Sequence, residues 1–386
     1  MSLLHTNTFA PAPKSIFQSG QYPLSKGDRI TVVGAGAFGG WSALSLLRKG
    51  FKVTLVDAWG PGNSRSSSGD ETRVIRSTYG NNAFYFDLNV RALTLWKENQ
   101  QRWGKEVFHN TGVIWFCYEE KAPLVDESIP FARKHKMEYE YLSVDEVHKR
   151  YPAIYTGDLH HAWFDPYGGY LKARESCLAV WQSFLAEGGQ FIQAYAQPGK
   201  PQAGRLHEVT LSSGEVLRSA AYLFACGPWM GKLFPEVLGE TIRCTKQEVY
   251  YFGVPKELAL QYDRLPAWID LDGKDFYYGI PGNNGRGFKI GVDKRGEAFD
   301  PTHGERISTT KVLADARQFI EHRYPGLKGM PVVESRVCPY ENSPDGNFVF
   351  QPHPEAGNLW FLGGGSGHGF KHGPAIGELV ANQFGG

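Results

Sequence analysis

The first strong hydrophobic pattern in the chain is a β-branched run, R-I-T-V-V, at residues 29–33. A short run that is apolar throughout is typical of a parallel strand buried on both faces. Apolar positions then recur at helical spacing over residues 41–48, and Lys49-Gly50 ends that helix. A second apolar run at residues 51–56 stops at Asp57. The pattern therefore predicts a strand–helix–strand unit of about 30 residues, the size of a dinucleotide-binding unit.

The same two periodicities continue along the rest of the chain in mixed order. Apolar runs predict strands at residues 111–116, 221–225, 249–252 and 358–362, and helical spacing predicts helices at residues 89–102, 175–187 and 374–383. Strand–turn–helix signals thus occur at both ends of the chain, with further strands between them. This order indicates an α/β fold in which a discontinuous, Rossmann-like domain is interrupted by a second domain rich in antiparallel sheet.

The length of 386 residues favours two interleaved domains over a single core. We assign residues 28–110, 168–243 and 333–386 to the dinucleotide-binding domain, and residues 111–167 and 244–332 to a substrate domain. Residues 1–27 contain Pro, Ser, Thr and Asn but no continuous apolar run. They therefore predict a flexible N-terminal extension and not a signal peptide.

Charge and cysteine content narrow the class of partner. Lys and Arg number 41 and Asp and Glu number 40, so the chain offers no large single-sign field for nucleic acid or an anionic membrane. No stretch approaches the roughly 20 apolar residues that span a bilayer. The five cysteines are widely spread without a C-x-x-C pair, which argues against disulfides and structural zinc and favours the cytoplasm. We expect a small-molecule enzyme without a metal, as a monomer or homodimer.

A glycine fingerprint, G-A-G-A-F-G, follows the first predicted strand. Gly34 permits the tight turn, Gly36 lets the backbone approach a pyrophosphate, and Gly39 allows close packing of helix on strand. Asp57 lies where a carboxylate accepts hydrogen bonds from a ribose. NAD and FAD proteins share this fingerprint. A second glycine-rich segment at residues 363–373, ahead of the last helix, favours FAD because its backbone N–H groups can approach an electron-rich ring. An ordinary flexible loop is the alternative for that segment.

Four further motifs, in this order, resemble the monomeric sarcosine oxidase group of the D-amino-acid-oxidase-like flavoproteins. They are S-S-S-G-D-E-T-R-V-I-R at 66–76, F-Y-Y-G-I-P at 276–281 followed by G-F-K-I-G at 287–291, C-P-Y at 338–340, and S-G-H-G-F-K at 366–371. The resemblance extends from about residue 29 to the C-terminus. It implies that the dinucleotide-binding domain binds FAD, with contacts that include Ser67, Gly364, Gly367, Gly369 and Lys371.

The resemblance also implies roles at the flavin. The cysteine matching Cys338 is joined to the flavin ring, so it implies covalent FAD here; a buried small hydrophobe is the alternative. Lys289 matches the lysine assigned to oxygen activation, a role that suits a fixed cation where oxygen becomes an anion. Arg73 matches a residue near the flavin. If its segment were helical, Arg73 would share a face with Arg76.

Substrate contacts follow from the same comparison. Arg76 and Lys371 match the pair that holds the substrate carboxylate, a planar two-pronged donor beside a point charge. Tyr278 and Tyr340 match tyrosines that line the pocket. We also place Trp229, with Trp268, as apolar surface for a larger side chain, although core packing is the commoner use of tryptophan.

Two departures from the sarcosine oxidases bear on the substrate. Asp293 stands where they carry a histidine, and Ser66-Ser67-Ser68 replaces a histidine-rich segment. An acid at position 293 would attract an ammonium group and weakens the case for sarcosine. We therefore expect an oxidase that converts the C–N bond of an α-amino acid to an imine, with O2 as acceptor and H2O2 as product.

A broad-range L-amino-acid oxidase is the first hypothesis for the substrate. A sarcosine, pipecolate or other N-alkyl amino-acid oxidase is the close alternative. An NAD-dependent dehydrogenase, or a flavin-binding subunit without its own substrate, would use only part of the motif set.

Overall fold

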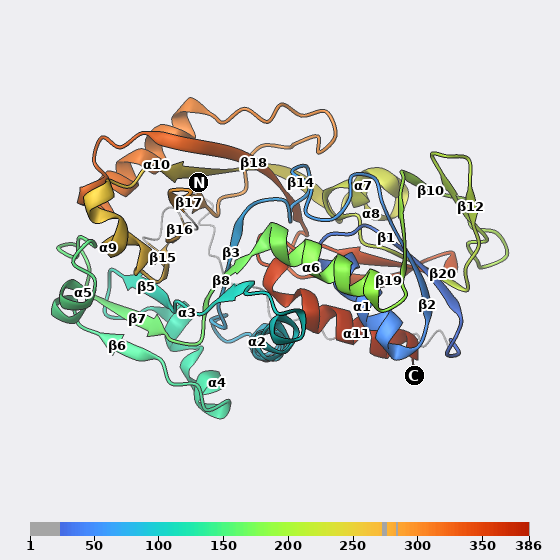
Figure 1. The fold of residues 1–386 in the computed structure, drawn as a ribbon, viewed down its shortest axis with the longest axis horizontal. Coiled ribbons are helices and arrows are strands. Elements are labelled where there is room, and N and C mark those ends of the chain that lie inside the picture. The colour runs from blue at the N-terminus through green and yellow to red at the C-terminus, as the bar shows by residue number, and fades with distance from the viewer. Residues whose placement is uncertain (1–23, 272–275, 283–284, 386) are drawn as a thin grey trace, which may run out of the picture.

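Two large sheets organise the part of the chain that the computed structural model describes, residues 24–271, 276–282 and 285–385 (Figure 1). Residues 1–23 of the predicted flexible extension lie outside these ranges. Residues 24–27 contact the body of the protein, because Leu24 packs against the main hydrophobic core and the Gly27 N–H donates to the Gly50 carbonyl over 2.9 Å. That contact differs from the flexible segment expected there.

The first sheet has six strands in the order β19-β20-β13-β1-β2-β9. The strands are β1 (Arg29–Val33), β2 (Lys52–Asp57), β9 (Gln190–Gln193), β13 (Ala221–Phe224), β19 (Val349–His353) and β20 (Ala356–Gly363). All neighbours are parallel except β19, which runs antiparallel to β20. Parallel pairing explains why β13 is buried throughout and why β1 is buried at every residue after Arg29, since helices cover such sheets.

Four long helices accompany this sheet: α1 (Ala37–Lys49), α2 (Ala83–Trp103), α6 (Ala173–Ala186) and α11 (Gly373–Gly385). Helix α1 packs against α6 and α11, and α11 packs against α2. At the start of α1, a Cβ on Gly39 would lie 1.9 Å from the Gly34 carbonyl oxygen, so only glycine allows this approach of helix to turn. The helix ends at Gly50, whose φ of 103° closes it in the left-handed conformation.

The second sheet has eight strands in the order β18-β14-β17-β16-β15-β5-β7-β6. They are β5 (Val113–Cys117), β6 (Glu140–Leu142), β7 (His161–Asp165), β14 (Arg243–Phe252), β15 (Ala267–Leu271), β16 (Phe276–Ile280), β17 (Phe288–Val292) and β18 (Val332–Asn342). Only the β15–β5 pair is parallel. Helix α10 (Thr310–Arg323) packs on it, and Phe319 of α10 stacks on Trp268 with ring centres 5.5 Å apart.

Two small sheets and several short helices complete the described chain. The sheets are β3 (Thr72–Ile75), β8 (Gly169–Lys172) and β4 (Phe108–His109), and β10 (Ala196–Pro198), β11 (Val209–Leu211) and β12 (Val216–Leu217). The short helices are α3 (Pro123–Asp126), α4 (Ile129–Lys134), α5 (Val144–Arg150), α7 (Met230–Leu233), α8 (Pro235–Leu238) and α9 (Ala259–Asp263), with 3-10 turns η1 (Gly227–Trp229), η2 (Lys256–Leu258), η3 (Pro325–Leu327) and η4 (Phe370–His372). The strand β3 lies between the two large sheets in Figure 1.

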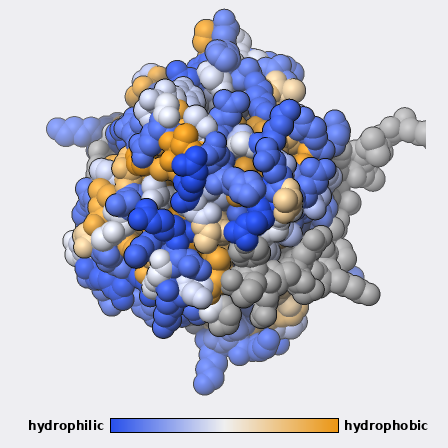
Figure 2. Space-filling model, turned by 90° about the vertical axis from the view of Figure 1, so that its right-hand side faces the viewer, coloured by the Kyte–Doolittle hydropathy of each residue, from blue (hydrophilic) through white to orange (hydrophobic). Residues whose placement is uncertain are grey.

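The fold class expected from the hydrophobic pattern is confirmed as α/β with a second, antiparallel-sheet-rich part. The proposed domain boundary at residue 333 falls inside β18, which pairs with β14 along residues 332–342. No helix within the described ranges is long and apolar enough to cross a membrane. The face drawn in Figure 2 is mostly hydrophilic, with small, separate apolar patches.

Candidate active site

Two cavities meet where the carboxyl ends of the six-stranded sheet face the eight-stranded sheet. The larger has a volume of about 340 Å³ and extends from the glycine fingerprint to the glycine-rich loop after β20. The smaller has a volume of about 100 Å³. Their shared wall consists of Arg73, Tyr340, Ser366, Gly367 and Phe370. A ligand in either cavity therefore contacts the same wall as a ligand in the other.

Asp57, at the end of β2, organises the part of the larger cavity that lies next to the glycine fingerprint. Its carboxylate accepts hydrogen bonds from the backbone N–H of Ala35, Trp59 and Gly60 over 2.7 to 2.8 Å. Burial raises the pKa of Asp57, and these N–H donors oppose that rise. Asp57 therefore joins the fingerprint turn to the loop after β2, and both line the cavity.

The serine segment borders the same cavity. The Ser68 hydroxyl accepts from the Ala37 N–H at the start of α1, over 3.1 Å. Ser67 donates to the Pro339 carbonyl over 2.6 Å and so connects this segment to β18. Gly36, Ser67 and Ser68 all line the larger cavity. Among the predicted cofactor residues, Gly34, Asp57, Gly367 and Gly369 also line this cavity, whereas Gly39, Cys338, Gly364 and Lys371 do not.

Both tryptophans predicted as substrate surface lie elsewhere. Trp229 lines the larger cavity but not the smaller one, and its ring packs at a tilt against Trp59 with ring centres 4.7 Å apart. Its indole N–H donates to the Thr302 hydroxyl over 2.8 Å. Trp268 is fully buried in the core of the eight-stranded sheet. Their positions correct the sequence-based placement, because aromatic type alone does not tell which wall a side chain joins.

Cys338 lies on β18, two residues before Tyr340, and is 7% exposed. It lines neither cavity. Burial and the charge of Asp70 raise the pKa of its thiol, and the cations Arg73, Lys289 and Arg336 lower it. The thiol therefore lies within the field of the charged cluster beside the shared wall.

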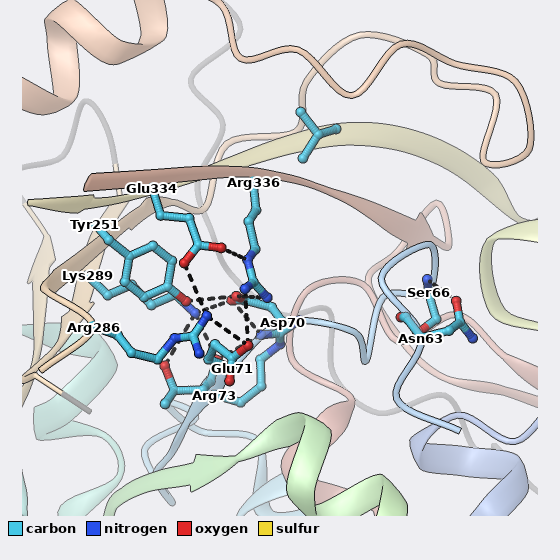
Figure 3. Close-up of polar contacts among 12 residues, drawn as sticks. Asn63, Ser66, Asp70, Glu71, Arg73, Tyr251, Arg286, Lys289, Glu334 and Arg336 are labelled. Atoms are coloured by element: carbon cyan, nitrogen blue, oxygen red, sulfur yellow. Dashed lines mark hydrogen bonds and ion pairs between the residues drawn. The ribbon is translucent and has the colours of Figure 1, made fainter. Parts of the chain in front are cut away.

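Lys289 belongs to a buried cluster of charges centred on Asp70 (Figure 3). The Asp70 carboxylate pairs with the Lys289 ammonium, accepts from the Tyr251 hydroxyl over 2.7 Å, and accepts from Arg73 over 2.9 Å. Lys289 also donates to the Thr72 carbonyl over 2.8 Å. Lys289 itself lines neither cavity, whereas Arg73 lines both.

The close packing of these charges determines the ionisation of Asp70 and Lys289. Burial raises the pKa of Asp70, but the charges of Lys289 and Arg73 outweigh it and hold the pKa well below its usual range. Burial lowers the pKa of Lys289, and Asp70 opposes that change. Sequence reasoning missed Asp70 as the partner of Lys289. Its signal was the acid within the S-S-S-G-D-E-T-R motif.

Arg76 and Lys371 form the floor of the smaller cavity. Arg76 is 7% exposed and Lys371 is 4% exposed, and neither forms an ion pair with a carboxylate within the described ranges. The Arg76 guanidinium lies 4.8 Å from the Tyr79 ring centre, and the Lys371 ammonium lies 5.1 Å from the same centre. Burial, and next the Arg76 charge, lower the pKa of Lys371 well below its usual value. Two buried cations that form no ion pair in the described part of the chain thus face one cavity, and the carboxyl of Asp293 lines the same cavity without pairing with either.

The opposite wall comes from the eight-stranded sheet. Tyr278 of β16 and Asp293, just after β17, line it, and burial raises the pKa of both groups. Charges of Arg76, Arg295 and Lys371 oppose the rise at Asp293. A Cβ on Gly367 would lie 2.6 Å from the Tyr340 ring and 2.9 Å from the Asp293 carboxylate, so glycine is required for this wall to close.

The segment of Arg73 and Arg76 is not helical, so the condition under which the two side chains would share a helical face is not met. Their segment is the strand β3, antiparallel to β8, and Arg76 follows its last residue. Strand geometry places residues three apart on opposite faces. Arg73 accordingly reaches the Asp70 cluster, whereas Arg76 reaches the smaller cavity.

A buried Tyr79–histidine group behind Lys371 was also missed. The Tyr79 hydroxyl lies 2.7 Å from His372 Nε2 and 3.1 Å from His368 Nδ1, and His368 Nε2 donates to the Gly346 carbonyl over 2.9 Å. Burial lowers the pKa of both histidines well below the usual value. His368 lines the smaller cavity. The S-G-H-G-F-K motif contained His368, but from the sequence roles were assigned only to Gly367, Gly369 and Lys371 of this motif.

Comparisons with known proteins agree with this geometry. The family model described as FAD dependent oxidoreductase (DAO) matches residues 29–383. Monomeric sarcosine oxidase from Arthrobacter sp. (strain TE1826) is 28% identical over 355 residues, 91% of each chain. N-methyl-L-tryptophan oxidase from Salmonella dublin is 28% identical over 362 residues, 92% of this chain and 93% of the relative.

Solved structures resemble the fold. The L-proline dehydrogenase from P. horikoshii superposes with a TM-score of 0.80 at 20% identity, covering 93% of both chains. The amino acid oxidase NikD superposes with a TM-score of 0.75 at 19% identity, covering 93% of this chain and 94% of its own.

Proposed function

Because this chain belongs to the family of FAD-dependent oxidoreductases, we propose that it is an oxidase of N-alkylated α-amino acids that uses O2 as acceptor. Two relatives that match over more than nine tenths of both chains are named for sarcosine and N-methyl-L-tryptophan. Both names denote N-methylated amino acids. They favour the N-alkyl alternative over the broad-range L-amino-acid oxidase that the sequence placed first.

The larger cavity fits FAD. Its fingerprint turn is a cradle that a side chain would fill, because a Cβ on Gly34 would lie 2.3 Å from the Ala225 carbonyl oxygen. The N-terminus of α1 opens into the cavity at Gly36 and Ala37, where backbone N–H groups and the helix dipole favour a pyrophosphate. Bound FAD supplies the two-electron acceptor for oxidation of a C–N bond.

The observation that carries the substrate proposal is the pair of buried cations Arg76 and Lys371, neither of which forms an ion pair with a carboxylate in the described part of the chain. A buried charge without a partner is costly, and a ligand carboxylate would relieve that cost at both residues. A carboxylate held there fixes the amino acid in the smaller cavity, against the wall that this cavity shares with the FAD cavity. Positioning of this kind turns an encounter into an oriented reaction.

The rest of the cavity favours an uncharged amine over a cationic side chain. Asp293, expected to attract an ammonium group, lies in the field of Arg76, Arg295 and Lys371. These three cations outnumber the single carboxylate. A substrate with a carboxylate and a neutral secondary amine therefore matches the local charge better than one with an additional cation.

We further propose that Lys289 retains the oxygen-activating role. Its charge lies behind Arg73, which lines both cavities, and Asp70 keeps the two cations close together. Two fixed cations in a water-poor site stabilise negative charge as it develops on oxygen.

Peroxide release by the purified full-length protein tests the substrate proposal. We expect N-methyl-L-amino acids, sarcosine and L-pipecolate to give a kcat/KM at least about tenfold above the matched primary amino acids. Arg76→Met and Lys371→Met should each raise KM by about tenfold or more, whereas Lys328→Met, at an exposed position, should not. Activity restricted to primary amino acids, or flavin reduction without peroxide, would contradict the proposal.

A further inference from the structure

A carboxyl group that no predicted role uses, Glu341, lines the FAD cavity. It follows Tyr340 on β18, and its carboxyl lies among three backbone segments. Added Cβ atoms on Gly363 and Gly227 would lie 3.2 and 3.7 Å from its Oε2, and one on Gly365 would lie 3.0 Å from its Oε1. The residue as a whole is half-buried, but Oε2 is enclosed and has no hydrogen-bond partner. An enclosed oxygen of this kind lacks the partner that such groups normally have.

No cation offsets this carboxyl. Among the described residues, no Lys, Arg or His forms an ion pair with Glu341. Its cross-strand neighbour on β14 is the thiol of Cys244, and Cys226 precedes the η1 turn on another side. Burial raises the pKa of both thiols, so both are neutral near pH 7. The surroundings therefore contain no positive group that would favour the ionised acid.

The charged groups near Cys244, the neighbour of Glu341, already have partners in other side chains or in the backbone. Lys232 of α7 pairs with Asp300 over 2.7 Å, and Arg306 donates to the carbonyls of Pro301 and Val337. Burial raises the pKa of Glu341 to about 7, against the opposing backbone N–H groups of Gly365 and Gly364. Glu341 is thus poised between its neutral and ionised forms in the FAD-free protein.

FAD changes this balance because it carries an anionic pyrophosphate and many hydrogen-bond acceptors. A carboxylate in the same cavity would repel the pyrophosphate, whereas a carboxylic acid can donate a hydrogen bond. We propose that Glu341 holds a proton in the FAD-loaded protein, donates it in a hydrogen bond to an acceptor atom of the cofactor, and thereby couples FAD binding to proton uptake from solvent. This proposal concerns the cofactor and does not depend on which amino acid is oxidised.

The coupling has a definite sign. Below about pH 7 the acid is already protonated and FAD affinity is independent of this group. Above that pH the FAD-free protein must take up one proton to bind, so the dissociation constant rises by up to about tenfold per pH unit. The dissociation constant stops rising at the pH where Glu341 ionises even with FAD bound.

Isothermal titration of FAD into the flavin-free, full-length Cys338→Ala protein measures this coupling, since that change keeps binding reversible. We expect the dissociation constant to rise about fivefold from pH 7 to pH 8, because about half of the acid is already ionised at pH 7. Glu341→Gln, which keeps a donor but cannot ionise, should remove this slope and bind as the parent does near pH 6. Glu355→Gln, an exposed control, should keep the slope. Equal slopes with and without Glu341→Gln would overturn the proposal.

Two further measurements test the hydrogen bond to FAD and the proton uptake independently of each other. Glu341→Leu should weaken FAD binding near pH 6 by about fivefold to tenfold, because it removes the donor. Binding as tight as the parent's would exclude the hydrogen bond. Titrations at about pH 8 in two buffers of different ionisation enthalpy, with Glu341 intact, should show uptake of close to one proton per FAD. A value near zero would overturn the coupling even if Glu341→Gln failed to fold.

Discussion

At the scale of single residues, the buried charges around the two cavities differ in whether they have a protein partner. Lys289 and Arg73 share Asp70, whereas Arg76 and Lys371 form no ion pair with a carboxylate within the described ranges. A buried pair that loses one member leaves an uncompensated charge at a cost of about 3–5 kcal/mol. The paired cations therefore contribute to stability, and the unpaired ones are available to a ligand.

Lys371 predicts a pH dependence of carboxylate binding. Burial lowers its pKa, so its ammonium is lost as pH rises through that lowered value, and affinity for a small carboxylate such as acetate should fall. Titration of the flavin spectrum with acetate across pH measures this. Lys371→Arg should remove the dependence because the guanidinium stays charged. An identical profile in Lys371→Arg would assign the titration to another group.

Cys338→Ala tests the covalent attachment that the resemblance implies. We expect the flavin of this variant to be released into the supernatant by acid denaturation, whereas the parent keeps yellow colour in the pellet. Cys177→Ala, which removes another buried thiol, serves as the control and should retain the attached flavin. Colour that stays with the Cys338→Ala pellet would exclude this cysteine.

Lys289→Met should slow reoxidation of the reduced flavin by oxygen about 100-fold while substrate reduction changes little. Stopped-flow absorbance measures the two half-reactions separately. The variant should also unfold more easily by about 3 kcal/mol, because Asp70 loses its closest cation and keeps only Arg73 and Arg336. An unchanged oxygen rate would confine Lys289 to this structural role.

The sequence motifs identified residues of the candidate site, but they did not predict which of these residues contact one another. Arg76, Lys371, Tyr278, Tyr340 and Asp293 were singled out from motifs, and the structure brings them to one cavity. The Lys289–Asp70 pair joins residues 219 apart in the chain, so only tertiary structure creates it. Trp229 was misplaced for the same reason.

At the scale of elements, β18 distributes its side chains between the cavities. Tyr340 lines both cavities, whereas Glu341 lines only the larger cavity and Asn342 only the smaller one. Alternation along a strand accounts for this division, since neighbouring side chains point to opposite faces. Insertion of one residue in β18 would therefore exchange the two sets.

Gly39→Ala tests the fit of α1 against the fingerprint turn. The new methyl group would lie 1.9 Å from the Gly34 carbonyl, so the turn must move, and we expect loss of bound flavin and about 2 kcal/mol or more of stability. Flavin content and thermal unfolding measure both effects. Gly40→Ala is the matched control, because its nearest contact is an ordinary 3.5 Å from Val180. Full flavin content in Gly39→Ala would contradict this account.

Element type was predictable where the apolar pattern was long or followed a glycine signal. The first strand coincides with β1, and the first predicted helix, residues 41–48, lies inside α1. The short T-R-V-I segment was ambiguous by itself. Its pairing with β8, about a hundred residues later, makes it a strand.

At the scale of the whole molecule, strands of both large sheets contribute residues to the lining of the larger cavity, so a ligand bound there bears on the stability of both. FAD removal should lower the unfolding temperature, since a ligand at a hundred times its dissociation constant stabilises the folded state by about 2.7 kcal/mol. Thermal unfolding of flavin-free and flavin-loaded protein measures the difference. With reversible binding, as in Cys338→Ala, the shift should grow with FAD concentration. Equal midpoints would contradict FAD binding to the folded chain.

The global arrangement was predictable only in outline. Order of elements indicated a dinucleotide-binding fold with an inserted antiparallel part, and the topology agrees. The ends of the inserted part could not be located, because β18 reads as one strand in sequence while it pairs with β14 and also borders the FAD cavity. Pairing partners, not local pattern, decide to which sheet such a strand belongs.

The two walls of the smaller cavity come from different parts of the fold, so one wall can change in sequence while the other stays the same. The residues proposed to hold the carboxylate, Arg76 and Lys371, lie just after β3 and in the glycine-rich segment. Ile269, Phe276, Tyr278 and Asp293, on the opposite wall, lie on β15, on β16 and directly after β17. Variation confined to β15, β16 and the end of β17 can alter which side chains are accepted while every amino acid is still held by the same end. A directed-evolution library for new amine substrates should therefore randomise those four positions and leave Arg76 and Lys371 untouched.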